Sequence, residues 1–259
     1  MYTNLDKVLV LSLAFLLLFS AFNTSQALAA TTLENDGLND LGFYSLAVIY
    51  FAYGVSCLFA SGVISNLGVK KALFIGSLFY ALYIATFILA AMKTNATAVW
   101  ACFILSASLT GFGASLIWVG QGRYISECAT SENMGLYNSI FWAIYMGSIL
   151  VGNLFSAFVI VQVNEAVFYM IMTCLSVLAS LVFLFLRQPE KVNNLYQEHQ
   201  VSVSDLIQLL KTKRMIKTLP LMIFAGICLA GNAGVFIPLL DLTMDQTPKC
   251  KEWSDAVRS

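Results

Sequence analysis

Seven stretches of this sequence are strongly apolar and contain no Asp, Glu, Lys, Arg or His. They cover approximately residues 8–30, 41–64, 72–92, 97–119, 136–162, 166–186 and 218–240. Roughly 20 helical residues cross the ~30 Å hydrocarbon core of a bilayer, so each stretch is long enough to span it. Lipid offers no hydrogen-bond partners to an open strand, which leaves helices as the structure of each span. The sequence therefore predicts an all-α, polytopic transmembrane helix bundle.

The composition agrees with a lipid environment. Hydrophobic residues make up 59% of the 259 residues and charged residues 11%, whereas soluble domains are about 45–50% apolar and about 25% charged. The net charge is zero, so no basic field for nucleic acid is expected. The six cysteines form no CxxC pair, and four of them lie inside apolar stretches, which disfavours a zinc site or a disulfide framework. No metal or cofactor is predicted.

The order of the stretches predicts four regions. Residues 1–187 form a six-helix transmembrane domain, and 188–217 form a cytoplasmic linker that begins where Pro189 stops the sixth helix. Residues 218–240 form a seventh transmembrane helix, and 241–259 form a polar, disordered tail. In the linker, Ser202 or Ser204 can cap a short amphipathic helix. Lysine and arginine at its end would face anionic lipid headgroups.

The positive charges predict the orientation of the spans. With a cytoplasmic N-terminus, only Lys93 falls in an outside loop before the tail. The inside regions then contain the other ten cations, which are Lys7, Lys70, Lys71, Arg123, Arg187, Lys191, Lys211, Lys213, Arg214 and Lys217. We therefore expect an integral membrane protein whose N-terminus lies in the cytoplasm.

Two features near the outer face leave alternatives open. Lys7, the apolar run after it and the small residues Ala27-Leu-Ala29 resemble a cleaved signal peptide. The run continues to about residue 30, which instead favours a retained first span. Asn95 in Asn95-Ala-Thr97 is a candidate glycosylation site, although the loop that holds it is very short.

Small and polar residues inside the spans are the candidate contact positions. Small residues four apart let helix backbones approach closely in lipid, and the predicted packing residues are Gly111, Ser115, Ser139, Ala143, Gly147 and Gly152. Polar side chains in spans either bond to other helices or line a pathway. The candidates for a cavity or for interhelical polar contacts are Asn23, Gln26, Gln121, Asn138 and Asn153.

The densest pattern is the stretch from Trp118 to Asn153, interpreted as a helix end, a short polar turn and the start of another helix. Its segments Trp118-Val-Gly-Gln-Gly-Arg-Tyr124, Asn138-Ser-Ile-Phe-Trp142 and Gly152-Asn153 resemble motifs of the Unc-93-like branch of the major facilitator superfamily. Segments 42–50 and 78–83 are similar to further family segments. The loop Gly62–Lys71 resembles the superfamily loop between its second and third helices, but has Asn66 where an Asp is usual.

This resemblance covers about residues 40–240 and implies one six-helix half of such a protein plus the first helix of the second half. It implies no catalytic residues. A transporter-like protein of unknown substrate is one functional hypothesis. The alternatives are a non-transporting accessory or regulatory subunit of an ion channel or membrane receptor, and a truncated inactive product. The expected partners are membrane lipid and either a second copy or another membrane protein such as a channel subunit.

An enzyme is disfavoured. The single histidine, His199, lies in the predicted linker, so no Ser–His–Asp set can form within the spans. The glycines Gly120 and Gly122 lack the strand–turn–helix context of a dinucleotide-binding loop.

Overall fold

The computed structural model describes residues 4–35, 38, 40–159, 162–189 and 203–231. These residues belong to two compact units, one up to Ser202 and one from Val203 onward. His199, the Ser202 cap, the second part of the predicted seventh span and the predicted tail lie outside the described residues.

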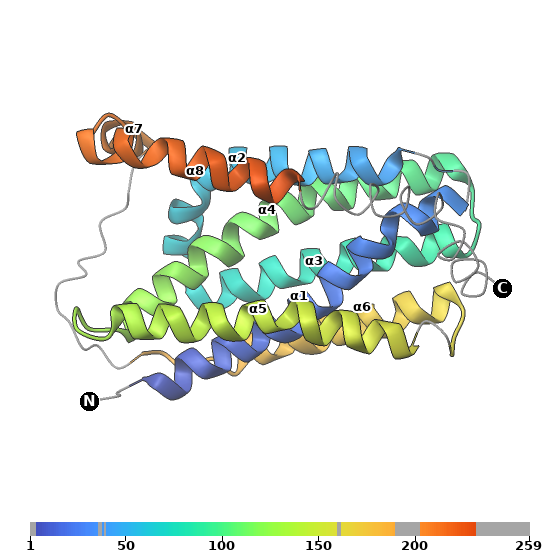
Figure 1. Cartoon of the computed structure of the whole chain (residues 1–259), viewed down its shortest axis with the longest axis horizontal. Coiled ribbons are helices and arrows are strands. Elements are labelled where there is room, and N and C mark those ends of the chain that lie inside the picture. The colour runs from blue at the N-terminus through green and yellow to red at the C-terminus, as the bar shows by residue number, and fades with distance from the viewer. Residues whose placement is uncertain (1–3, 36–37, 39, 160–161, 190–202, 232–259) are drawn as a thin grey trace, which may run out of the picture. The chain divides into compact units, whose positions relative to one another are not determined.

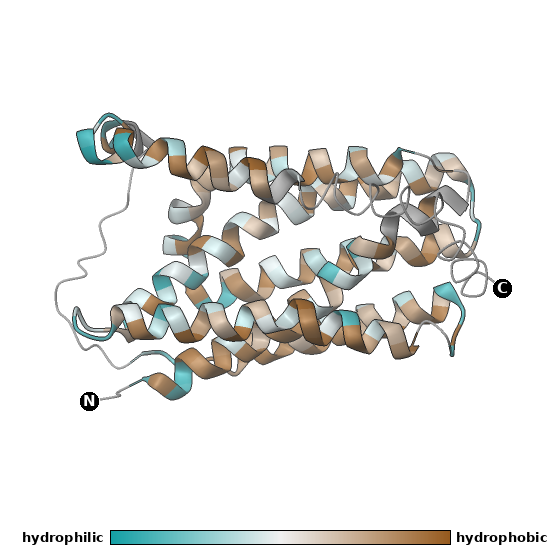
Figure 2. Cartoon of the chain, viewed as in Figure 1, coloured by the Kyte–Doolittle hydropathy of each residue, from teal (hydrophilic) through white to brown (hydrophobic). Residues whose placement is uncertain are grey.

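Six helices form the first unit (Figure 1). They are α1 (Leu5–Asn35), α2 (Leu41–Leu67), α3 (Val69–Ala91), α4 (Ala96–Cys128), α5 (Met134–Val159) and α6 (Glu165–Leu184). All six are long and apolar enough to cross a membrane. Figure 2 shows why: apolar residues cover the helices, and hydrophilic residues gather at the helix ends and turns. The expectation of an all-α polytopic bundle is confirmed.

Two groups of helices build this bundle. Helix α4 packs along α2 and α3, and α1 packs along α5 and α6. Helix α3 joins the groups because it also packs along α6. The spans of α1, α3 and α4 are the most buried, and those of α2 and α5 the least, with only 17% of their residues buried. Most of the surface of α2 and α5 is therefore open within this unit.

The helices are longer than the apolar stretches predicted. Helix α4 continues to Cys128, nine residues beyond the predicted end at 119, so Gln121 and Tyr124 are helical and do not form the predicted polar turn. The reason is that these polar residues are compatible with a helix. Arg123 and Glu127 even form an ion pair one turn apart, with 2.8 Å between Nε and Oε1. The turn lies instead between Cys128 and Met134.

Helices α2 and α3 are separated only by Gly68. Its φ of 81° lies in the left-handed region, which glycine adopts without steric strain. Gly62, predicted to belong to this loop, lies inside α2. Lys70 and Lys71 then fall in the first turn of α3, and both are exposed.

The second unit contains α7 (Val203–Leu210) and α8 (Lys213–Gly231). Asp205 lies in the first turn of α7, as the sequence predicts. Helix α8 includes Pro220 and covers the first part of the predicted span 218–240. Because residues 232–240 are outside the described part, the seventh span remains a prediction.

Candidate functional site

One short segment of α4 connects the helices of the first unit. The Trp118 ring lies 5.6 Å from Phe15 and 5.4 Å from Phe19 of α1, and it stacks on Trp142 of α5 at 5.8 Å. At Gly120, an added Cβ would lie 3.2 Å from the Leu73 side chain of α3.

The same segment reaches the end of α6. The Tyr124 hydroxyl donates a hydrogen bond of 2.7 Å to the Arg187 carbonyl, just after α6. One helical turn later, the Cys128 carbonyl accepts a 3.2 Å bond from the buried Asn4 amide, directly before α1. Cys128 is the last residue of α4, so its carbonyl has no partner within that helix and is satisfied by Asn4. The segment from Trp118 to Cys128 thus fixes three helix ends at one end of the bundle.

Aromatic side chains fill the interior beside Trp118. Phe19 is the centre, with ring centroids 5.3 Å from Tyr80 of α3 and 5.2 Å from Tyr145 of α5. The aromatic cluster, as we call it, comprises Phe15, Phe19, Phe22, Tyr80, Trp118, Phe141, Trp142 and Tyr145. Edge-to-face and offset pairs of this kind contribute about 0.5–1.5 kcal/mol beyond their buried area.

Gly111 marks the contact between α4 and α2. An added Cβ there would lie 2.5 Å from the Ile49 carbonyl oxygen and 2.6 Å from the Ala52 Cβ. Ser115, one turn further along α4, is also buried, and its hydroxyl donates to the Phe112 carbonyl. The two backbones are therefore so close that only glycine fits at position 111.

Helix α5 has a similar contact on one side only. At Gly152, an added Cβ would lie 2.6 Å from both the Ser20 carbonyl and the Thr24 hydroxyl of α1. Ser20 also donates a 3.1 Å hydrogen bond to the Ser148 carbonyl. Gly147 is half-buried, with Leu16 of α1 as its nearest neighbour at 3.9 Å.

Ser139 and Ala143, in contrast, are exposed on the open side of α5. The Ser139 hydroxyl bonds the Gly135 carbonyl of its own helix, and an added Cβ at Gly135 would meet nothing within 4 Å. The structure therefore separates the predicted packing residues into an occupied set and an open set.

The five polar candidates do not meet in one place. Gln121 is buried near the end of α4, and Asn138 is half-buried near the start of α5, the next helix in the chain. The Asn138 amide donates a 2.9 Å hydrogen bond to the Met134 carbonyl of its own helix. Asn23 and Gln26, both half-buried, lie in the second half of α1, and Asn153 lies in the second half of α5. They are consequently near the opposite end of the bundle.

Asn153 differs from the other four because its side chain is exposed. Among the residues that the structure describes, its amide makes no hydrogen bond, and its exposed neighbours on α5 are Leu150 and Leu154. Ser139 and Asn153 are about four turns apart and so lie near one line along the helix. We call this side of α5, with Gly135, Ser139, Ala143, Leu150 and Asn153, the open face.

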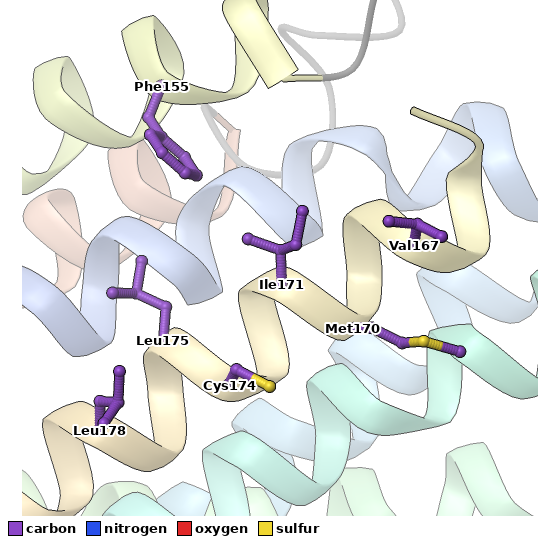
Figure 3. A pocket seen from close by; sticks show the side chains of 7 residues that line it. All are labelled: Phe155, Val167, Met170, Ile171, Cys174, Leu175 and Leu178. Atoms are coloured by element: carbon purple, nitrogen blue, oxygen red, sulfur yellow. The ribbon is translucent and has the colours of Figure 1, made fainter. Parts of the chain in front are cut away.

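The described part of the chain has an apolar hollow between α5 and α6, of about 350 Å³ (Figure 3). Phe155 covers it from α5, and the other side chains come from α6, among them Met170, Cys174 and Leu178. No charged or amide side chain lines it. Such a surface suits lipid chains better than a polar solute.

Comparison with known proteins identifies the family. Residues 36–249 match the family described as "Ion channel regulatory protein UNC-93". The chain belongs to the UNC-93 family. Among curated relatives, it is 29% identical to UNC93-like protein MFSD11 of Xenopus laevis over 78% of this chain and 46% of that protein. It is 32% identical to UNC93-like protein 3 of Arabidopsis thaliana, over 68% of this chain and 36% of that protein.

A third relative, protein unc-93 homolog A of Bos taurus, is 31% identical over 61% of this chain and 35% of that protein. The chain thus spans less than half the length of these relatives. The family description and these names agree on the UNC-93 family, and they mention no catalytic activity.

Four of the segments that resemble UNC-93 motifs meet in space. Trp118, Trp142 and Tyr80 come from three of them and belong to the aromatic cluster. From a fourth, the Ser45 hydroxyl shares a 2.9 Å hydrogen bond with Tyr83. Four motif segments of this UNC-93 protein therefore build one internal structure, whereas Asn153 of a fifth is exposed on α5.

Sequence reasoning missed the contribution of α1. Phe15, Phe19 and Phe22 recur at helical spacing, a signal that marks one face of the helix. Asn4, Ser20 and Thr24 were missed as well. For Asn4 and Ser20, the partners are 124 and 128 residues away, which no local pattern indicates.

Asn95, the candidate glycosylation site, is exposed and precedes α4. Its side-chain oxygen accepts a 3.0 Å bond from the Thr97 amide and so caps the helix. Glycosylation at Asn95 remains a prediction.

Proposed function

We propose that this chain is a membrane-embedded regulatory subunit that binds transmembrane helices of a partner protein on the open face of α5. The partner would be a second copy of the chain or another membrane protein such as a channel subunit. One observation supports this most strongly: Asn153 exposes an amide from the second half of α5, a helix that is apolar enough to cross a membrane.

An amide in hydrocarbon loses its hydrogen bonds to water and gains none from lipid. Its transfer costs several kcal/mol unless a partner is supplied. A polar group on a neighbouring helix supplies one, and such bonds contribute about 0.6–2 kcal/mol. Asn153 thus favours a neighbouring helix over lipid at this position.

The small residues of the open face fit the same proposal. Gly111 on α4 and Gly152 on α5 show how small residues in this bundle allow close contact with α2 and α1. Gly135, Ser139 and Ala143 offer the same kind of surface without a described helix against it. A partner helix could approach there and reach Asn153 further along.

The interior favours binding over coupled transport. The aromatic cluster fills the space between α1, α3, α4 and α5. The apolar stretches of the spans carry no Asp, Glu or His, the groups that usually relay protons in transporters. The family description as ion channel regulatory protein agrees with a regulatory role.

A transporter-like role is the second candidate. It is favoured by the hydroxyls of Thr24, Ser25 and Ser148, which are buried without a hydrogen-bond partner in the described structure. Asn23 and Gln26 are near Thr24 and Ser25 in α1. In such a protein, the substrate would bind between two halves, and the relatives are long enough to include a second one.

The test compares two asparagines of one helix. The full chain carrying Asn153→Leu or Asn138→Leu is expressed in the source cell, crosslinked, and its native complex is sized in mild detergent. We expect the wild type and Asn138→Leu to run in a discrete complex, because the Asn138 amide is satisfied within α5. Asn153→Leu should lose at least half of it.

The identity of the second chain then separates the partners, since a homodimer and a heteromer differ in mass. Equal complexes for both variants, or a wild type that runs as a single chain, would rule out the proposal. In that case, solute uptake by the full-length relative becomes the experiment of choice.

A further inference from the structure

The second unit carries a dense positive charge beside exposed apolar residues. Lys211 lies in the turn after α7, and Lys213, Arg214 and Lys217 lie in the first turns of α8. All four side chains are exposed. From Leu206 to Leu240, the sequence contains no Asp or Glu, so the chain supplies no acid of its own within this stretch.

The cations are grouped on one side of α8. Lys213 and Lys217 are one turn apart and lie above one another, with Arg214 adjacent. Met215 and Leu219, also one turn apart, lie on the opposite side. The start of α8 therefore has one charged and one apolar side.

Apolar residues flank the cations along the chain as well. Before them, Leu209 and Leu210 are exposed in α7, and after them Leu221 and Phe224 are exposed in α8 by more than 60%. An acidic protein surface would pair with the cations but leave these residues in water. A bilayer surface satisfies both, with phosphates at the cations and acyl chains at the leucines.

We propose that residues 209–219 dock on an anionic phospholipid surface, with Lys211, Lys213, Arg214 and Lys217 at the level of the lipid phosphates. The charge complementarity and the adjacent apolar residues identify this occupant. The docking would hold the start of α8 at the interface, just before its apolar part enters the bilayer. This proposal does not depend on the partner bound to α5.

The geometry of the turn supports a defined presentation of the charges. The Thr212 hydroxyl donates a 2.7 Å hydrogen bond to the Leu209 carbonyl, and it accepts a 3.4 Å hydrogen bond from the backbone amide of Met215. The Thr212 carbonyl accepts from the Ile216 amide at 3.0 Å. Thr212 thereby joins α7 to α8 between the cations Lys211 and Lys213.

The experiment uses the full chain in lipid nanodiscs of phosphatidylcholine alone or of phosphatidylcholine with phosphatidylserine. Hydrogen–deuterium exchange is followed on peptides that cover residues 205–217. One cation near an anionic surface contributes about fivefold to binding. We expect at least tenfold slower exchange with phosphatidylserine, and loss of this difference at high salt.

Two variants separate this surface from general charge effects. Replacing all four cations by Gln should remove the effect of phosphatidylserine. Lys70→Gln with Lys71→Gln, which removes two exposed cations from α3, should leave exchange at 205–217 unchanged. Equal exchange in both lipids, or an effect that survives the fourfold replacement, would overturn the proposal. So would equal protection of the detergent-solubilised chain by inorganic phosphate, which would indicate a phosphate site.

Discussion

The Tyr124 hydroxyl and the Arg187 carbonyl, 2.7 Å apart, join α4 to the end of α6 across 63 residues of sequence. Two other residues of the same part of α4 contact further helices. Trp118 lies against α1 and α5, and Gly120 lies against α3. About two turns of α4 thereby fix this end of the bundle.

Loss of this bond should weaken the bundle. Tyr124→Phe removes the hydroxyl and keeps the ring, so we expect a loss of about 0.5–1.5 kcal/mol in unfolding free energy. Denaturant unfolding in detergent measures it. Tyr44→Phe, at a tyrosine that is 57% exposed, is the matched control and should change little. Equal effects of the two changes would show that the Tyr124 bond is not structural.

Close backbone contact should make Gly111 intolerant of any side chain. In Gly111→Ala, the new methyl group would meet the Ile49 carbonyl at 2.5 Å. We expect a loss of about 1–3 kcal/mol, as for other overpacked positions. Gly122→Ala on the same helix meets nothing within 4 Å and should be neutral or slightly stabilising. The thermal unfolding of the two variants measures this difference. If Gly111→Ala were as stable as the wild type, α2 and α4 would have to lie further apart.

The aromatic cluster should depend on Phe15, which touches five other rings. Phe15→Leu removes these ring contacts but keeps an apolar side chain. We expect a loss of about 1–3 kcal/mol, whereas Phe43→Leu, at an exposed site, should have little effect. The same result would indicate that α1 stays in the mature protein. If the chain were cleaved after Ala29 as a signal peptide, Phe15→Leu would leave the mature chain unchanged.

The orientation can be tested at two exposed lysines. Lys71 lies in the first turn of α3, and Lys93 lies just after the end of that helix. With the N-terminus in the cytoplasm, a cysteine in place of Lys93 should react with a membrane-impermeant reagent from the outside. The Lys71→Cys variant should react only after permeabilisation. The reverse pattern would invert the topology.

How far the sequence predicts this structure depends on the range of the interactions. Apolar stretches predicted all six helices of the first unit, because a span must be apolar over its whole length. They placed the end of α4 too early, because Gln121 to Glu127 are polar but still helical. Polarity marks the membrane boundary, whereas a helix ends where its backbone bonds end.

The candidate site was only partly predictable. The small residues around Gly111, Gly152 and Ala143 follow one pattern in sequence, yet only the first two lie against another helix in the described unit. Asn138 and Asn153 are likewise similar in sequence, but one bonds its own helix and the other is exposed. Which side of α5 is open depends on contacts with α1, and these are distant in sequence.

The most direct test of a partner on the open face is crosslinking in the native membrane. A photoreactive amino acid is placed at Ala143 on α5, or at Leu178 of α6, which lines the apolar hollow and is 58% exposed. We expect a discrete protein adduct from position 143 and mainly lipid adducts from position 178. Asn153→Leu should reduce the protein adduct at 143 by at least half. Lipid adducts alone from both positions would show that no partner helix binds the open face of α5.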